Sequence, residues 1–363
     1  MLFEIRPHLQ GSLVFDGLQK YLVEAMLSAL EGRPLNQTAL PSGLINAIDG
    51  NARTRQAVEA MVATLGELND GQKQGLINAL TQDTSPCAFL SDRSAMPLAL
   101  PEKLFDSLKA LTGHLYNRTA KFSGVEGACG ECVDDHYARF RAIAAPGNGN
   151  VCCVCGTEYL APVQAGVDDK DQWRGPYDHI LAISHYPLYG IDPRNLLPIC
   201  GTCNSKAKHA KNLLVDPQGN RRVAFSPWSE FAATREIRVR IDDTDLTPCV
   251  ILEFIGDDAV RQEKLKTWDD VFGIKSRVEG EFLALREKVS EDARAANDAD
   301  FLLRLKEQAA ARWQEMRQTP FNYWRARVYA AVWDMPAASR EALRRVSVTP
   351  LEADPELDAL FGS

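Results

Sequence analysis

Residues 200–212 read CGTCNSKAKHAKN, and this stretch does most to decide the fold. Its cysteines, Cys200 and Cys203, have the spacing of a zinc knuckle, because two thiolates on one tight turn can both reach a tetrahedral ion. A second pair with the same spacing, Cys152 and Cys155, lies upstream. Two such pairs with an intervening unit predict a four-cysteine site that holds structural Zn²⁺.

A third cysteine pair, Cys129 and Cys132, is followed by His136. These residues could supply three ligands of a second zinc site, for which the sequence offers no evident fourth ligand. Alternatively, the pair could replace Cys152 and Cys155 as the partner of the last knuckle. It could also be a thiol pair in a loop with no metal or redox role.

The overall composition restricts the class of protein. The 363 residues are 45% hydrophobic and 25% charged, with a net charge of −8. This composition excludes disorder of the whole chain, and the acidic balance argues against a basic protein that coats nucleic acid. Neither a run of about 18 apolar residues nor a signal peptide is visible, so we expect a cytoplasmic protein without membrane insertion. In a reducing compartment, paired cysteines favour metal binding over disulfides.

Hydrophobic periodicity and composition divide the chain into three expected domains. Residues 1–120 should form a helical N-terminal domain, because apolar residues recur there at helical spacing. Residues 121–220 are rich in cysteine, glycine and aspartate and should form a metal-organised module. Residues 221–363 should form a C-terminal domain, in which short strands precede long helices.

The individual elements follow from the same patterns. We expect helices near residues 16–31, 53–67 and 101–114, short strands near 222–225, 236–241 and 250–255, and long charged helices over 257–296 and 299–319. The aromatic stretch at 321–333, FNYWRARVYAAVW, could stack nucleic-acid bases. Its spacing gives no continuous aromatic platform, so we expect a packed core helix instead.

Four polar residues stand in a fixed order around the last knuckle. Asp178 and His179 come first, Asn195 follows, and Asn204 comes directly after Cys203. This order resembles the HNH endonuclease family, and the resemblance covers under a fifth of the chain. It implies a central ββα-metal module, stabilised by zinc. With the helices expected on both sides of this module, the fold class is α+β and the chain is mostly helical. Many members of the family have proline where this chain has alanine, three residues after the histidine.

The resemblance implies a role for each residue of this set. His179 would be the general base that activates water, and Asn195 would hydrogen-bond the loop that holds it. Asp178 and Asn204 would hold one catalytic Mg²⁺ or Mn²⁺ ion, since their oxygens are hard ligands, with His209 as an alternative to Asn204. Neighbouring residues of a regular strand point to opposite faces, so Asp178 and His179 can share a site only if the strand ends or bulges there.

Three lysines follow the last knuckle, and no acidic residue lies among them. If a helix begins near Asn204, Lys208 and Lys211 lie on the same face as Asn204, and Lys206 lies off that line. We expect these lysines to bind phosphate, with a solvated helix face as the simpler interpretation.

Together these patterns favour a metal-dependent HNH endonuclease that hydrolyses phosphodiester bonds of DNA. Nuclease cores inside larger helical chains resemble bacterial antiphage effectors and restriction nucleases, which implies partner proteins such as an ATPase or a membrane sensor. One alternative is a non-catalytic zinc-ribbon adaptor that binds nucleic acid or protein. Another is an HNH-type RNase, because a core that contacts phosphate and reads no bases does not separate RNA from DNA.

Overall fold

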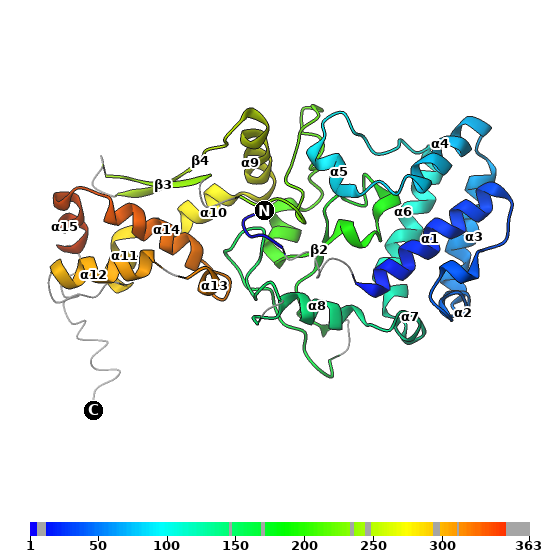
Figure 1. Ribbon diagram of the computed structural model, residues 1–363, viewed down its shortest axis with the longest axis horizontal. Helices are drawn as coiled ribbons and strands as arrows, with labels where there is room; N and C mark the ends of the chain where they lie inside the picture. The colour runs from blue at the N-terminus through cyan, green and yellow to red at the C-terminus, as the bar shows by residue number, and fades with distance from the viewer. Residues whose placement is uncertain are drawn as a thin grey trace, which may run out of the picture.

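The computed structural model combines many helices with two small antiparallel sheets, each of two strands. The structure describes residues 1–5, 12–144, 147–167, 171–232, 236–243, 248–292, 298–310 and 312–345. The expected mostly helical α+β class is therefore confirmed. Figure 1 shows the N-terminal helices at one end of an elongated molecule, the cysteine-rich region in the middle and the last helices at the other end.

The N-terminal region is built from helices alone among its described residues. They are α1 (Leu13–Glu31), α2 (Leu44–Asp49), α3 (Ala52–Gly66), α4 (Asp70–Thr81), α5 (Pro86–Ser91) and α6 (Glu102–Asn117), with 3₁₀ turns η2 (Gln37–Ala39) and η3 (Thr119–Lys121). The three helices expected from periodicity correspond to α1, α3 and α6. Leu18 and Leu108 on their apolar faces are fully buried, as amphipathic helices require.

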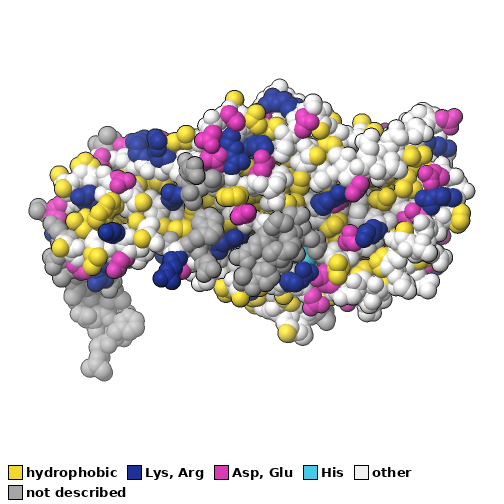
Figure 2. Space-filling view, in the orientation of Figure 1, with side chains coloured by type: hydrophobic (Ala, Val, Ile, Leu, Met, Phe, Trp, Pro, Cys, Tyr) yellow, Lys and Arg dark blue, Asp and Glu magenta, His cyan; other side chains and the backbone are white. Residues whose placement is uncertain are grey.

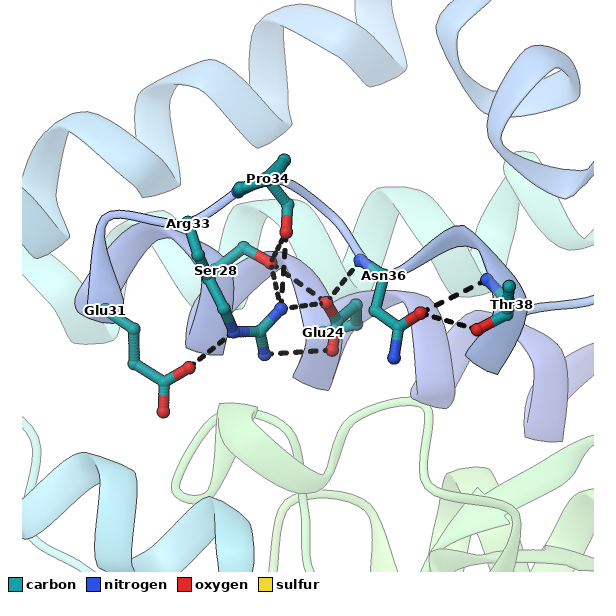
Figure 3. A network of polar contacts seen from close by, with 7 residues as sticks. All are labelled: Glu24, Ser28, Glu31, Arg33, Pro34, Asn36 and Thr38. Atoms are coloured by element: carbon teal, nitrogen blue, oxygen red, sulfur yellow. Dashed lines mark hydrogen bonds and ion pairs between the residues drawn. The ribbon is translucent and has the colours of Figure 1, made fainter.

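A polar network closes the C-terminal end of α1 (Figure 3). The Glu24 carboxylate accepts from the Asn36 amide at 2.6 Å and the Ser28 hydroxyl at 3.0 Å, and it pairs with the Arg33 guanidinium. Hydrogen bonds, chiefly from Arg33, lower the pKa of Glu24 to about 2. Gly32 ends the helix in the left-handed conformation, with φ 64°, so the chain turns back over its own last turn.

The central region holds few regular elements and many turns. It contains α7 (Ser123–Cys129), α8 (Val133–Arg141), β1 (Tyr177–His179), η5 (Pro187–Tyr189), η6 (Pro193–Asn195), β2 (Leu196–Pro198) and the π-helix η7 (Thr202–Lys208). Strands β1 and β2 pair antiparallel, with Asp178 opposite Leu197 and His179 opposite Leu196. This hairpin followed by a helix brings together the two segments that carry the motif residues.

The C-terminal region contains the second sheet and the remaining helices. They are β3 (Ile237–Asp242), β4 (Cys249–Phe254), α9 (Ala259–Phe272), α10 (Ile274–Glu281), α11 (Leu285–Asp292), α12 (Asp298–Ala309), α13 (Trp313–Met316), α14 (Asn322–Trp333) and α15 (Ala337–Arg345). The core-helix interpretation of the aromatic stretch is confirmed, because Tyr323, Trp324 and Tyr329 of α14 are buried. None of the helices within the described ranges has the length and apolarity needed to cross a membrane.

Two expectations for this region are wrong. Residues 222–225 form no strand, because the backbone amides of Arg222 and Ala224 bond to the Leu214 and Leu90 carbonyls instead of forming a ladder. The long helix expected over 257–296 is divided, since Gly273 adopts the left-handed conformation with φ 61° and ends α9. Residues 293–297 of that stretch, and residue 311 of the next, lie outside the described residues.

Charged side chains are distributed widely over the surface. On the face drawn in Figure 2, basic and acidic side chains are interspersed, which agrees with the moderate net charge of −8. The boundaries at residues 120 and 220 stay a prediction. The first residues of the chain lie against the central region, where the Leu2 and Phe3 amides both donate to the Cys153 carbonyl at 3.0 Å.

Candidate functional site

Two cysteine pairs converge in the middle of the molecule. The thiols of Cys152, Cys155, Cys200 and Cys203 lie within 4.8 Å of one another, and all four residues are buried. A Zn–S bond of about 2.3 Å implies S–S separations of about 3.8 Å in a tetrahedral site. The Sγ atoms of Cys155 and Cys200 are 3.9 Å apart, and all nine cysteines are unpaired by disulfides. The group can therefore hold a structural zinc ion, as the spacing predicts.

Hydrogen-bond donors surround the four sulfurs. The backbone amides of Cys200, Cys203 and Thr157 each approach a sulfur at 3.4 Å. The Arg277 guanidinium, from α10, donates to Cys203 Sγ at 3.2 Å and to Cys155 Sγ at 3.5 Å. Four thiolates around Zn²⁺ carry a net charge of −2, so a cation and N–H donors beside them stabilise the metal-bound state.

Within the part of the chain that the structure describes, the third cysteine pair has no further ligands with which to form a metal site. Among the described residues, the four-cysteine cluster is the single group of three or more His, Cys, Asp and Glu side chains close enough to share an ion. His136 Nδ1 instead lies 2.6 Å from the Tyr177 hydroxyl. The Cys132 sulfur accepts from the Asp135 amide and caps the start of α8. The structure thus selects Cys152 and Cys155 as partners of the last knuckle.

His179 ends strand β1 with its imidazole in a defined orientation. Its Nε2 lies 2.8 Å from the Gly190 carbonyl oxygen. A carbonyl only accepts, so Nε2 carries the proton and Nδ1 keeps a free lone pair in the neutral ring. Burial lowers the pKa of His179 to about 4, although the Asp178 charge opposes this. The Tyr116 ring packs edge-on against the imidazole, with the two ring centroids 4.6 Å apart. The neutral, proton-accepting form is therefore the stable one near pH 7.

Asn195 joins the two segments that hold this imidazole. Its Oδ1 accepts from the Leu181 amide at 2.7 Å, and its Nδ2 donates to the carbonyls of Leu181 and Tyr189 at 3.0 and 2.9 Å. The side chain is fully buried. Leu181 lies two residues after His179, and Tyr189 precedes Gly190, whose carbonyl binds the ring. The contacts place Asn195 where the sequence-based expectation put it, bonding the loop around the histidine.

Asp178 points away from the imidazole and into the interior. Its Oδ1 accepts from the Lys208 ammonium at 2.7 Å, and this ammonium also donates to the His179 carbonyl at 2.6 Å. The side chains of Lys208 and Asp178 are 1% and 6% exposed. Strand alternation therefore separates the two motif neighbours, as it does in any regular strand. Lys208 does not lie on an exposed phosphate-binding face, which corrects that expectation.

The remaining motif residues follow the geometry of η7. This helix is of the π type, and its last bond runs from the His209 amide to the Asn204 carbonyl at 2.9 Å. The wider turn changes which residues share a face, and the helix ends at Lys208, before Lys211. Lys211 donates to the Asp270 and Val271 carbonyls at the end of α9. Asn204 is partly exposed, and Lys206 and His209 are exposed.

Three contributors to the site were not expected from the sequence. Gly190 acts through its backbone carbonyl, which carries no side-chain signal. Tyr116 comes from α6, far away in the chain, and its hydroxyl donates to the Tyr177 carbonyl at 3.0 Å. Arg277 comes from α10 and reaches the cysteines across the boundary expected at residue 220. Contacts of this kind depend on tertiary packing, so spacing along the chain does not reveal them.

Compared with family models, with curated proteins and with solved structures, the chain matches none of them. The functional argument therefore depends on the residues and geometry of this chain.

Proposed function

We propose that the chain is a zinc-stabilised nuclease of the HNH type that hydrolyses phosphodiester bonds, with DNA as its substrate. The observation that carries the proposal is the imidazole of His179. It is fixed through Nε2 on the Gly190 carbonyl, and its pKa of about 4 keeps Nδ1 unprotonated near neutrality. A neutral imidazole with one free nitrogen is suited to remove a proton from the attacking water.

The proposal gives the surrounding residues separate tasks. Asn195 keeps the loop from Leu181 to Gly190 closed, so the carbonyl that orients the imidazole stays in place. The four-cysteine cluster holds β2 and η7 against the segment around Cys155. A scaffold that only bound zinc would need the cysteines but neither a buried asparagine clamp nor an oriented histidine. These contacts favour the nuclease over the non-catalytic adaptor.

The resemblance also implies a divalent ion held by Asp178 and Asn204. The surroundings of Asp178 do not fit this assignment, because an ammonium already occupies its Oδ1. The cavity beside it has a volume of about 20 Å³ and is lined largely by apolar residues such as Val154, Leu197 and Phe272. Mg²⁺ keeps several waters when it binds protein, and this space holds about one. The space beside Asp178 is therefore too small and too apolar for a hydrated Mg²⁺ ion.

The positions of the lysines bear on how the substrate is delivered. Of the three lysines after the knuckle, Lys208 is buried and Lys211 binds the end of α9. Lys206 and Lys211 are both exposed, but the Lys211 ammonium is already bonded to backbone carbonyls of α9. This segment therefore supplies little attraction for phosphate, and we expect weak intrinsic DNA affinity. We propose that a partner delivers the substrate, such as the ATPase or membrane sensor of a bacterial antiphage or restriction system.

A cleavage assay tests the proposed function. Plasmid, linear duplex, single-stranded DNA and RNA are each incubated with the zinc-loaded protein and Mg²⁺ or Mn²⁺. We expect His179→Ala to lower cleavage by roughly 10²–10⁴-fold, the usual contribution of a general base. His185→Ala is the matched control, since His185 is an exposed loop histidine bonded to the Ala210 carbonyl. Equal cleavage by both variants would exclude His179 as the base, and cleavage of RNA alone would favour the RNase.

A further inference from the structure

Lys208 is unusual because its charged side chain lies inside the protein. Lysine is almost never fully buried unless it is paired, and this one is 1% exposed. Its ammonium has two acceptors, the Asp178 carboxylate and the His179 carbonyl. One lysine therefore binds both residues at the end of β1, the strand that presents the imidazole.

Energetics explain why such a pair stays together. A buried charge without a partner costs far more than the pair as a whole, so removal of either member is strongly unfavourable. The cavity that adjoins Asp178 is lined largely by apolar residues such as Ile180, Leu213 and Phe272, whose side chains offer an ammonium no acceptor. The protein interior thus favours the ion pair between Lys208 and Asp178 over a lysine in contact with water.

The backbone around Lys208 gives an independent sign that its position is imposed. His209, the residue that follows η7, has φ 47° and ψ −119°, a backbone conformation that residues other than glycine rarely adopt. Such strain persists where the surrounding contacts hold it in place. Here the π-helical turn ends directly after Lys208, with the lysine directed inward and His209 exposed.

We propose that Lys208 is a positioning residue that acts as a built-in cation of the hydrolytic site. It neutralises Asp178 and fixes the His179 carbonyl, so Asp178 is its counter-ion and not a ligand of a divalent metal. The effect on catalysis rests on the proposed nuclease function, whereas the pair itself does not. The family resemblance implies that a metal ion binds the aspartate at the end of β1. In this chain the ammonium of Lys208 takes the place of that ion.

A double-mutant cycle in urea unfolding tests the pair in the zinc-loaded protein. We expect Lys208→Met and Asp178→Leu each to lower the unfolding midpoint, and the double variant to recover most of the loss, because no charge is then left unpaired. Lys206→Met, an exposed lysine of the same helix, is the control for this measurement and should leave the midpoint unchanged. Additive losses, or a midpoint unchanged in Lys208→Met, would overturn the proposal.

Mn²⁺ binding, followed by electron paramagnetic resonance, tests the assignment of Asp178 without any need for cleavage. We expect Asp178→Asn, which keeps the shape of the side chain, to bind Mn²⁺ as the unchanged protein does. A fall in affinity of about tenfold or more, the size expected when coordination is disturbed, would identify Asp178 as a metal ligand and overturn the proposal. Absence of Mn²⁺ binding by either protein would support it.

Kinetics add a readout that stability alone does not change. If the unchanged protein cleaves DNA, Lys208→Met should lower kcat and leave KM nearly unchanged, and Lys208→Arg should restore part of kcat. A rise in KM at constant kcat would assign Lys208 to substrate binding instead. If the unchanged protein cleaves nothing, the proposed function fails, and the unfolding and Mn²⁺ experiments still decide on the ion pair.

Discussion

The four-cysteine cluster and the end of β1 use short motifs in opposite ways. In the cluster, Cys200 and Cys203 direct their thiols to the same point. At the end of β1, the neighbours Asp178 and His179 direct their side chains to different partners, Lys208 and Gly190. A tight turn brings together residues three positions apart, whereas a strand separates residues that are adjacent. The conformation of the backbone therefore decides whether neighbours in a motif share a site.

Of the changes that test this comparison, removal of zinc should have the largest effect on the fold. Because a four-cysteine site contributes its binding free energy to folding, chelation should unfold the central region. The indoles of Trp268 and Trp324 donate to the Val154 and Cys155 carbonyls at 3.0 and 2.7 Å, so tryptophan fluorescence should report the loss. Cys200→Ser should lower the bound zinc, and Cys249→Ser, at an exposed cysteine, should not. A fully folded, zinc-free protein would contradict the account.

Loss of the hydrogen bonds that Asn195 makes around His179 should have the next largest effect. In Asn195→Asp a carboxylate would face the Leu181 and Tyr189 carbonyls, and a buried donor would be lost. We expect stability to fall by about 1–3 kcal/mol and cleavage to fall by at least tenfold. Urea unfolding and the plasmid assay measure the two effects, with Asn78→Asp, at an exposed helical position, as the control. Retained cleavage in Asn195→Asp would show that the loop needs no clamp.

A smaller effect is expected where the C-terminal region meets the cluster. Arg277→Met removes the guanidinium beside Cys155 and Cys203 and should speed zinc release to a chelator by about tenfold, the usual size of outer-shell effects. Arg277→Lys should recover part of the loss. Arg238→Met, at an exposed position of β3, serves as the control. Unchanged zinc release in Arg277→Met would make this contact irrelevant to the metal.

The smallest effect concerns the network at the end of α1, outside both sites. Glu24→Gln should cost on the order of 1–2 kcal/mol of unfolding free energy, because Glu24 pairs with Arg33. The folded pKa of about 2 lies below the ordinary value of 4.5. The stabilisation is therefore fully present above about pH 4.5 and is lost as pH falls toward 2. Unfolding curves between pH 2 and 6 measure this, with exposed Glu59→Gln as the control.

The sequence predicted those features that depend on local spacing. Helices α1, α3 and α6 follow from apolar residues at helical intervals, and the pairing of Cys152 and Cys155 with the last knuckle follows from ligand spacing. The predictions were wrong where the backbone conformation or the hydrogen-bond partners of a segment depend on more than its local sequence pattern. The left-handed Gly273 ended a helix that charge and periodicity would continue, and residues 222–225 found hydrogen-bond partners outside any sheet.

The sequence named candidate site residues, but it predicted only some of the contacts that these residues make. Asn195 lies where its motif position implies, because it bonds segments close to it in the chain. Lys208 lies in a π-helix and pairs with Asp178 in the interior, and neither feature can be predicted from helical periodicity. Tyr116 and Arg277 reach the site from distant helices, which only tertiary packing determines.

The pH dependence of DNA cleavage tests the central claim most directly. The base must be unprotonated to accept a proton, so with a pKa of about 4 for His179 the rate should stay level from pH 8 down to about pH 5. It should fall only as the pH approaches 4, and His179→Ala should remove this limb together with most of the activity. A fall centred near pH 6.5, or a profile unchanged in His179→Ala, would contradict the account.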